Sequence, residues 1–455
     1  MRKTILAFTR LVIALFSFIF LPAFQKSSQT RVHIDLSQDA LSYSSDVLDK
    51  WMMMQIRLMS NTTASFNGPF VRVYSYSGLA AYAAIVPGLS KNGYEWFSAV
   101  PLKLMPDILT LEKDKKYHWP SSVNAAMAYM NKSMFPFTNI SNKIAIDSLE
   151  QAIETGFGKK TDAATIERSS AFGKRMAQRV FEWSETDGYR HADDPFIAPT
   201  GPGKWEPTPP SFSKLVTPYW GNLRTIVPGS TENTQPPFPV PYSEDSASAF
   251  YSEVNKVYTI SQNLTPKQKA IVLFWKDINP GISAPGHWLN ILRQVIQEEK
   301  TPLEKAAYVY ALTGMSLNDA WISCWKTRYI HNLLRPVTYV RKVMRHSDWL
   351  PALPTPPHPE YSSGFAALAG AVSEVLTVQF GNRYKITDHT YDYLGMASRT
   401  YSSFYEMAKE AADSKMYGGI HYQFSVDAGL QQGRQVAQNI ETILSKKNKA
   451  PESAN

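Results

Sequence analysis

The chain has 455 residues, of which 44% are hydrophobic and 19% charged, so it can bury one large core or two fused ones. Its net charge of +8 comes from dispersed lysines and arginines. This pattern argues against nucleic-acid binding and suits the steering of a small anionic substrate. The single cysteine, Cys324, excludes an internal disulfide, and its apolar surroundings in "WISCWKT" predict a buried core residue.

Residues 1–24 have the organisation of a secretory signal peptide. A basic start at residues 2–3 precedes an apolar core at 11–20, and Leu21-Pro22-Ala23 offers a cleavage site. An uncleaved anchor is the alternative, because Arg10 interrupts the apolar run. No other stretch approaches 18 apolar residues, so we expect a soluble protein, periplasmic or secreted, with no membrane span after signal removal.

Helical periodicity dominates the rest of the chain. Helices are expected near 41–60, over the amphipathic stretch 165–188, and twice within 301–334, with a break near Gly314. Alternating patterns typical of strands are few. The sequence therefore predicts an all-α fold, a helical bundle protein.

A proline-rich segment divides the helical pattern. Residues 195–241 hold about a dozen of the 30 prolines, which predicts an irregular crossing between a helical half at 25–194 and another at 242–445, with a tail at 446–455. We expect this crossing to pack on the fold because it carries four large aromatic residues: Trp205, Phe212, Trp220 and Phe238.

Two stretches of the C-terminal half place oxyanion-binding groups at helix positions. In "KTRYIHNLLRPVTYV", Arg328 and Arg335 are two helical turns apart, and Pro336 places Arg335 at a helix end. They are either surface arginines with separate partners or two cations that share an anion. In "EYSSGF", Ser363 and Gly364 begin a helix whose free N–H groups favour an oxyanion, although an ordinary serine N-cap looks the same.

A third stretch, "SKMYGGIHYQF", places His421 six residues after Lys415. Gly418 and Gly419 between them allow close approach of another chain segment. A lone histidine of this kind is more often structural than functional, so this stretch gains meaning only together with the other two.

The three stretches in this order resemble the signature of the vanadium-dependent haloperoxidase and type-2 phosphatidic acid phosphatase superfamily, Lys-x6-Arg-Pro, Pro-Ser-Gly-His and Ser-Arg-x5-His. Flanking stretches such as "KWEPTPPSFSKLVTPYWG" and "FWKDINPGISAPGHWLNI" resemble its bacterial soluble haloperoxidase-like branch. The resemblance runs from about residue 40 to 445. It implies an all-α fold with a four-helix bundle around the oxyanion site.

The resemblance also implies roles for individual residues. His421 bonds covalently to vanadate, or to phosphate in the phosphatases, and the anion clamp comprises Arg328, Arg335, Ser363, Gly364 and Lys415. Arg328 stands where the family has lysine, and Lys415 where it has arginine, so the charge total is kept although the donor geometry changes.

Phe365 stands where the family has its acid–base histidine. Loss of such a group costs typically about 10²–10⁴ in rate. The electrostatic clamp usually contributes more to the rate than the acid–base group, so residual activity is expected. Other groups that could substitute for the histidine are His358 foremost, then Glu360, His331 and His389.

Two further positions depart from the family pattern. Ser362 replaces its proline, and Ser425 stands four residues after His421, where many members have an acidic residue that orients the histidine. Asp427 is two positions further along and is not expected to reach His421.

The leading hypothesis is an exported haloperoxidase-like enzyme with vanadate on His421 that uses hydrogen peroxide to oxidise iodide or bromide. One alternative is a phosphatase with His421 as nucleophile toward a phosphomonoester. The other is a pseudoenzyme that binds phosphate or vanadate without turnover. The organic substrate and the oligomeric state are left open.

Overall fold

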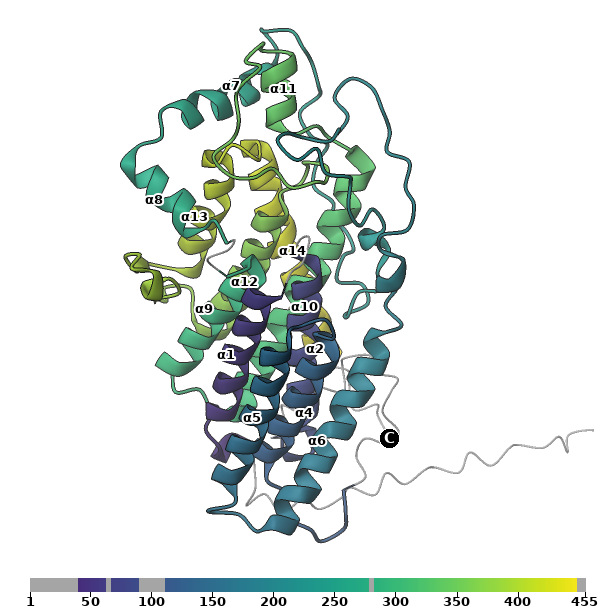
Figure 1. Cartoon of the computed structure of the whole chain (residues 1–455), viewed down its shortest axis with the longest axis vertical. Coiled ribbons are helices and arrows are strands. Elements are labelled where there is room, and N and C mark those ends of the chain that lie inside the picture. The colour runs from purple at the N-terminus through teal and green to yellow at the C-terminus, as the bar shows by residue number, and fades with distance from the viewer. Residues whose placement is uncertain (1–39, 63–66, 90–110, 278–281, 448–455) are drawn as a thin grey trace, which may run out of the picture. The chain divides into compact units, whose positions relative to one another are not determined.

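The computed structural model describes residues 40–62, 67–89, 111–277 and 282–447. The predicted signal peptide lies outside these residues. The described part contains these α-helices (Figure 1): α1 Asp46–Asn61, α2 Gly68–Ala83, α4 Trp119–Met134, α5 Ile140–Phe157, α6 Ala163–Ser184, α7 Ala249–Gln262, α8 Pro266–Phe274, α9 Ala284–Glu298, α10 Leu303–His331, α11 Pro336–Lys342, α12 Gly364–Phe380, α13 Phe404–Tyr417 and α14 Gln423–Lys447.

Strands are minor in this fold. β1 (Ile386–Asp388) pairs antiparallel with β2 (Arg399–Tyr401), with Ile386 opposite Tyr401, and the described residues form no other sheet. The predicted all-α class is therefore confirmed. Within the described ranges, no helix combines the length and the apolar character needed to span a bilayer.

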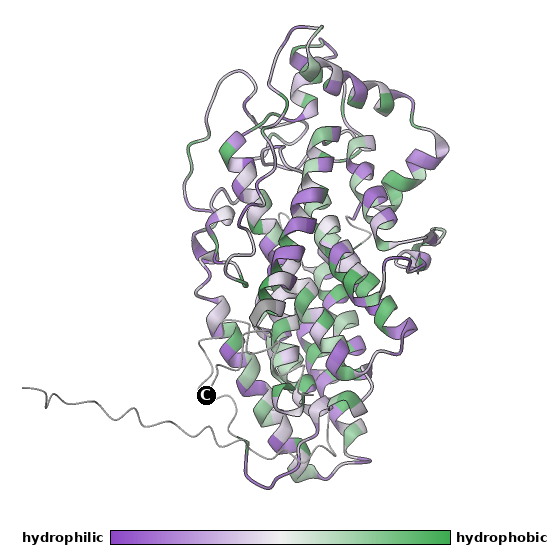
Figure 2. Cartoon of the chain, turned by 180° about the vertical axis from the view of Figure 1, so that it is seen from behind, coloured by the Kyte–Doolittle hydropathy of each residue, from purple (hydrophilic) through white to green (hydrophobic). Residues whose placement is uncertain are grey.

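Amphipathic helices build the bundle, as α6 illustrates. Its predicted inner face is buried at Ile166, Gly173, Met176 and Val180, while Trp183 is only partly buried. Along the helices hydrophilic and hydrophobic residues alternate, as Figure 2 shows. This pattern fits helices that pack one face against neighbours and leave the other in water.

The stretch 301–334 forms one helix, not the two that we predicted. Gly314 lies inside α10, and a Cβ there would come within 2.7 Å of Ser75 Cα on α2. This glycine therefore permits close packing of two helices and does not end a helix. The cost of about 1 kcal/mol for a helical glycine is offset by that contact.

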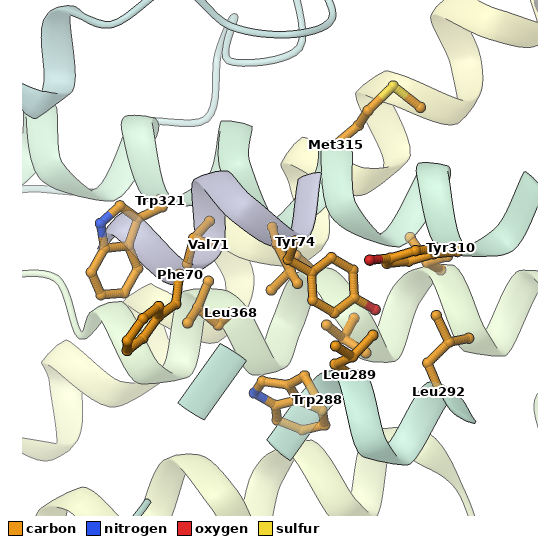
Figure 3. Close-up of a cluster of buried hydrophobic side chains, with 14 of the residues drawn as sticks. Phe70, Val71, Tyr74, Trp288, Leu289, Leu292, Tyr310, Met315, Trp321 and Leu368 are labelled. Carbon is orange, nitrogen blue, oxygen red and sulfur yellow. The ribbon is translucent and has the colours of Figure 1, made fainter. Parts of the chain in front are cut away.

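Helix α10 joins the hydrophobic core to the C-terminal helices. Figure 3 shows Tyr74 of α2 and Tyr310 of α10 with Leu289 of α9 and Leu368 of α12 in the same buried cluster. The two tyrosine rings meet edge to face at 5.2 Å between centroids. Helix α10 also contacts α14, so it runs through the middle of the packing.

Helices α12 and α14 approach closely through glycines. A Cβ at Gly433 would lie 1.9 Å from Ala367 O, and one at Gly429 would lie 2.3 Å from Ser363 O. No side chain larger than hydrogen fits at either position. The start of α12 is thereby pressed against the first turns of α14, where two of the three predicted motifs meet.

The proline-rich crossing is irregular, as predicted, with one short 3-10 turn at Trp220–Asn222. Of the four aromatic residues that suggested packing of this segment, Trp205 and Trp220 are buried, whereas Phe212 and Phe238 are exposed.

Candidate anion-binding site

The three predicted motifs meet at one cavity of about 670 Å³. Arg328 comes from the last turn of α10 and Lys415 from the last turn of α13. Gly364 begins α12, and His421 lies just before α14. These four residues line the cavity, whereas Arg335 and Ser363 are completely buried behind its wall.

His421 is held in one orientation by a carboxylate. Its Nδ1 lies 2.5 Å from Glu360 Oε1, which also accepts the backbone N–H of Tyr422 at 3.2 Å. On the other side of the ring, Arg335 Nη1 lies 3.4 Å from Nε2. Because a guanidinium can only donate, Nε2 is the acceptor and Nδ1 carries the proton that is donated to Glu360.

The surroundings of His421 keep its imidazole neutral. Burial, and then the charges of Arg335 and Arg328, hold its pKa well below the ordinary value. Burial also raises the pKa of Glu360 to about 7, against the effect of the same arginines. A neutral ring with its lone pair on Nε2 is the form that can coordinate a metal or attack phosphorus.

The carboxylate that orients His421 comes from an unexpected direction. Ser425, at the position where the family resemblance suggested an acidic group, places its Oγ 3.5 Å from Glu360 O, and Asp427 is exposed and bonded to Gln423. We had considered Glu360 only as a substitute acid–base group. Its place in the segment before α12 gave no signal of a contact with a residue 61 positions further along the chain.

A neutral histidine joins the two arginines. His358 Nδ1 accepts from Arg328 Nη1 at 2.6 Å and from Arg335 Nη2 at 2.9 Å. Burial and these two guanidiniums hold the pKa of His358 well below its usual range. This bridge gives one N–H of each arginine a hydrogen-bond acceptor, but the neutral histidine cancels no positive charge. It differs from the alternative in which each arginine is paired with a partner of its own.

His358 lines the cavity and is buried in its wall, with 5% of its surface exposed. Both arginines also donate to backbone carbonyls, and Arg328 Nε donates to Cys324 Sγ at 3.5 Å. Arg335 donates to His358 O at 2.9 Å and to Ile420 O at 3.0 Å, and Arg328 donates to Pro359 O at 2.5 Å. These contacts fix both guanidiniums beside His421.

The start of α12 has the predicted form. Ser363 is its N-cap and accepts the N–H of Ala366 at 3.4 Å. A Cβ at Gly364 would lie 3.0 Å from the Trp321 ring and 3.4 Å from Arg328 Nη2. Glycine therefore leaves space between the helix start and the guanidinium, where an oxyanion can approach the backbone.

Phe365 faces the cavity and carries a cation on its ring. Lys415 Nζ lies 3.8 Å from the ring centroid and donates a hydrogen bond to Trp275 O. Burial lowers the pKa of Lys415 to about 8, although the charge of Asp277 opposes this shift. The other two candidate histidines do not line the cavity, since His331 packs on Tyr361 and His389 is exposed beside Asp392.

The charges around the cavity do not balance. Arg328, Arg335 and Lys415 are buried, and none of them forms an ion pair with a carboxylate among the described residues. The carboxylate of Glu360 is bonded to His421 instead. Buried charges without partners are costly, so this donor set fits a multiply charged tetrahedral oxyanion such as vanadate or phosphate. No group of three His, Cys, Asp or Glu side chains in the described ranges is arranged to hold a metal cation.

Comparison with known proteins agrees with the predicted resemblance. Residues 308–449 match the family model described as the VCPO second helical-bundle domain. No curated protein matches the chain significantly by sequence.

Solved structures show the same fold over most of the chain. A bacterial vanadium-dependent iodoperoxidase is similar with a TM-score of 0.76 and 27% identity over 88% of this chain and 96% of the other. The holo form of a bacterial vanadium-dependent chloroperoxidase gives a TM-score of 0.62 and 17% identity over 86% and 94%. The apo form of such an enzyme gives 0.60 and 17% over 84% and 94%. The family model and the iodoperoxidase structure support the superfamily resemblance predicted from the three motifs.

Proposed function

We propose that this member of the vanadium haloperoxidase superfamily binds vanadate through His421 Nε2 and oxidises iodide or bromide with hydrogen peroxide. The observation that carries the proposal is the pairing of a neutral, oriented imidazole with three buried cations that lack carboxylate partners. Because the sequence of residues 1–24 predicts a signal peptide, we further propose that the reaction takes place outside the cytoplasm.

The chain's own residues would prepare the site for this reaction. Glu360 keeps the proton of His421 on Nδ1, which leaves the Nε2 lone pair available. Arg328, Arg335 and Lys415 hold the negative charge of the oxyanion, and the backbone at Gly364 allows it to come close. Vanadate, when bound, supplies a Lewis acid that activates peroxide without changing its own oxidation state.

The overall reaction is X⁻ + H2O2 + H⁺ → HOX + H2O, in which the halide gives two electrons to the O–O bond. Without the acid–base histidine, an easily oxidised halide is favoured over chloride. The similarity to an iodoperoxidase at 27% identity, against 17% for the chloroperoxidases, supports the same preference.

Thermal unfolding of the mature protein with vanadate or phosphate tests whether the site binds anions. We expect vanadate to raise the melting temperature of the wild type in proportion to ln(1 + [L]/Kd), and His421→Ala to lose most of this shift. His389→Ala is the matched control, because that histidine is exposed and away from the cavity. No shift in the wild type would contradict the proposal.

Halogenation of a phenol dye by the vanadate-loaded protein then separates the candidate functions. Iodide-dependent turnover that His421→Ala abolishes supports the peroxidase. A phosphatase would instead hydrolyse activated aryl phosphates well ahead of alkyl phosphates, because Phe365 cannot protonate an alkoxide. Binding of vanadate without either activity would identify a pseudoenzyme.

A further inference from the structure

The proposed reaction consumes one proton, and Phe365 cannot supply it. His358 does not replace the missing donor, because its Nδ1 already accepts from two guanidiniums that disfavour its protonation. Glu360 accepts from His421 Nδ1 and Tyr422 N, so its Oε1 is committed to orienting the histidine. Glu360 also does not line the cavity, so a donor within the protein would be another group there.

Lys415 is the group in the right place. Its Nζ lies over the face of Phe365, on the ring that occupies the position of the lost histidine. It lines the same cavity as His421, and its described contacts are this ring and the backbone oxygen of Trp275. One hydrogen bond and one ring contact leave further ammonium protons available to a bound ligand, because the group has three.

We propose that Lys415 delivers the proton of the peroxidase reaction in place of the family's histidine. This inference rests on the proposed function of the site. Arginine, the residue that the family has at this position, does not release its proton in proteins, whereas lysine does when it is buried. The two departures from the family pattern, phenylalanine for histidine and lysine for arginine, thus meet at one contact and restore a donor.

Atoms and electrons balance in this step. The halide attacks one oxygen of hydrogen peroxide and a halide–oxygen bond forms as the O–O bond breaks. The electron pair of that bond passes to the other oxygen, which takes a proton from Lys415 Nζ and leaves as water. The neutral amine then regains a proton from solvent through the open side of the cavity.

The titratable groups that line the cavity with Lys415 come from four segments, and Lys276 accompanies Asp277 in the first of them. Asp277 follows α8, His421 precedes α14, Arg328 belongs to α10 and His358 precedes α12. Asp277 favours the ammonium form, but its Oδ1 is bonded to His287 Nδ1 at 2.7 Å and to Tyr391 at 2.9 Å. With a pKa of about 8, Lys415 is protonated at neutral pH and is a far better acid than an exposed lysine.

The test compares Lys415→Arg with Lys415→Gln in the mature protein, by vanadate-induced thermal stabilisation and by iodide turnover. Lys415→Arg keeps the positive charge and should keep the stabilisation, but its kcat should fall by about 10²-fold. Lys415→Gln should lose much of the stabilisation as well. Lys409→Arg is the control, because that lysine is exposed on the same helix and pairs with Asp413.

A second comparison needs no turnover. From about pH 7 to 9.5, vanadate stabilisation of the wild type should decline relative to Lys415→Arg above about pH 8, as the lysine loses its charge and the arginine does not. Both proteins meet the same vanadate species at each pH, so the difference reports on residue 415. Adding Phe365→His to Lys415→Arg should raise kcat at least about tenfold, because this pair restores the family's residues at these two positions.

Three results would overturn the inference. An unchanged kcat in Lys415→Arg would exclude proton delivery by Lys415 and leave the peroxidase proposal standing. A fall in kcat that follows lost vanadate stabilisation, without rescue by Phe365→His, would limit Lys415 to anion binding. Absence of peroxidation in vanadate-bound wild type would reject the proposed function itself.

Discussion

Two buried histidines of this molecule differ in charge, since one is cationic and the other neutral. His287 on α9 lies between two carboxylates, with Nδ1 2.7 Å from Asp277 and Nε2 2.8 Å from Asp388. Although burial lowers its pKa, the two carboxylates raise it to about 9. His421 also bonds to a carboxylate, yet burial and the cations around it hold its pKa well below normal.

The difference shows that a hydrogen-bonded carboxylate does not by itself make a histidine cationic. The net charge of all the groups around the ring decides whether the imidazole is protonated. Around His287 two negative groups face one ring, and the ring becomes the counter-ion that lets them be buried. Around His421 two guanidiniums and an ammonium outweigh Glu360, and the ring stays neutral with a lone pair to offer. The first arrangement holds the structure together, and the second is suited to ligand binding.

The largest expected effect comes from removing the cation between the carboxylates. His287→Leu would leave Asp277 and Asp388 buried without their partner, which costs about 3–5 kcal/mol in the free energy of unfolding. Chemical denaturation at neutral pH measures this loss. His389→Leu, which removes an exposed histidine beside a carboxylate, should change stability by less than about 1 kcal/mol. Equal losses in the free energy of unfolding would show that the buried His287 contributes no more to stability than the exposed His389.

The charge on His287 also makes stability depend on pH. Its folded pKa of about 9 exceeds its ordinary value of 6.5, so its contribution is complete below pH 6.5 and is lost as pH rises through 9. At about 1.36 kcal/mol per pH unit, the full effect is about 3 kcal/mol. The free energy of unfolding of the wild type should fall over this range more steeply than that of His287→Leu. Parallel pH curves would contradict the assignment of an imidazolium.

A smaller effect is expected when Glu360, the carboxylate bonded to His421, is replaced by a neutral amide. In Glu360→Gln the amide can still accept from His421 Nδ1, but more weakly, and it can also present N–H and favour the wrong tautomer. We expect vanadate affinity to fall about 10–100-fold, the usual range for groups that orient a metal-binding histidine. Isothermal titration with vanadate measures this fall. An unchanged affinity would mean that Arg335 and the backbone suffice to orient the ring.

The sequence predicted much of the fold, and four of the six predicted site residues line one cavity, namely Arg328, Gly364, Lys415 and His421. The spacing of Arg328 and Arg335 predicted that they share a helix, but they do not, because α10 ends at His331 and Arg335 is the N-cap of α11, directly before Pro336. The helical class and the N-cap at Ser363 follow from local patterns of side chains and proline. Such patterns were sufficient because each depends on neighbours within one or two turns. The roles of the gathered residues, including His421, stay proposals until the tests above are made.

The features that sequence analysis missed depend on contacts between distant segments. Gly314 was taken as a helix break, since only the packed structure shows that α2 requires a glycine there. The orienting role of Glu360 and the burial of His287 between carboxylates had no local signal. Asp388 is 101 residues from His287, and neither the spacing nor the composition of its strand indicates the pairing.

Because α10 is one continuous helix, the position at which the chain is cut into fragments matters. The family match begins at residue 308, inside a helix of 29 residues that starts at Leu303, and the half of α10 that packs on α2 is continuous with the half that carries Arg328. A fragment cut at residue 308 would expose the surface that α2 covers. The two pieces, produced separately, would be natural partners for reassembly, and recovery of vanadate binding would report their association in a split-protein assay.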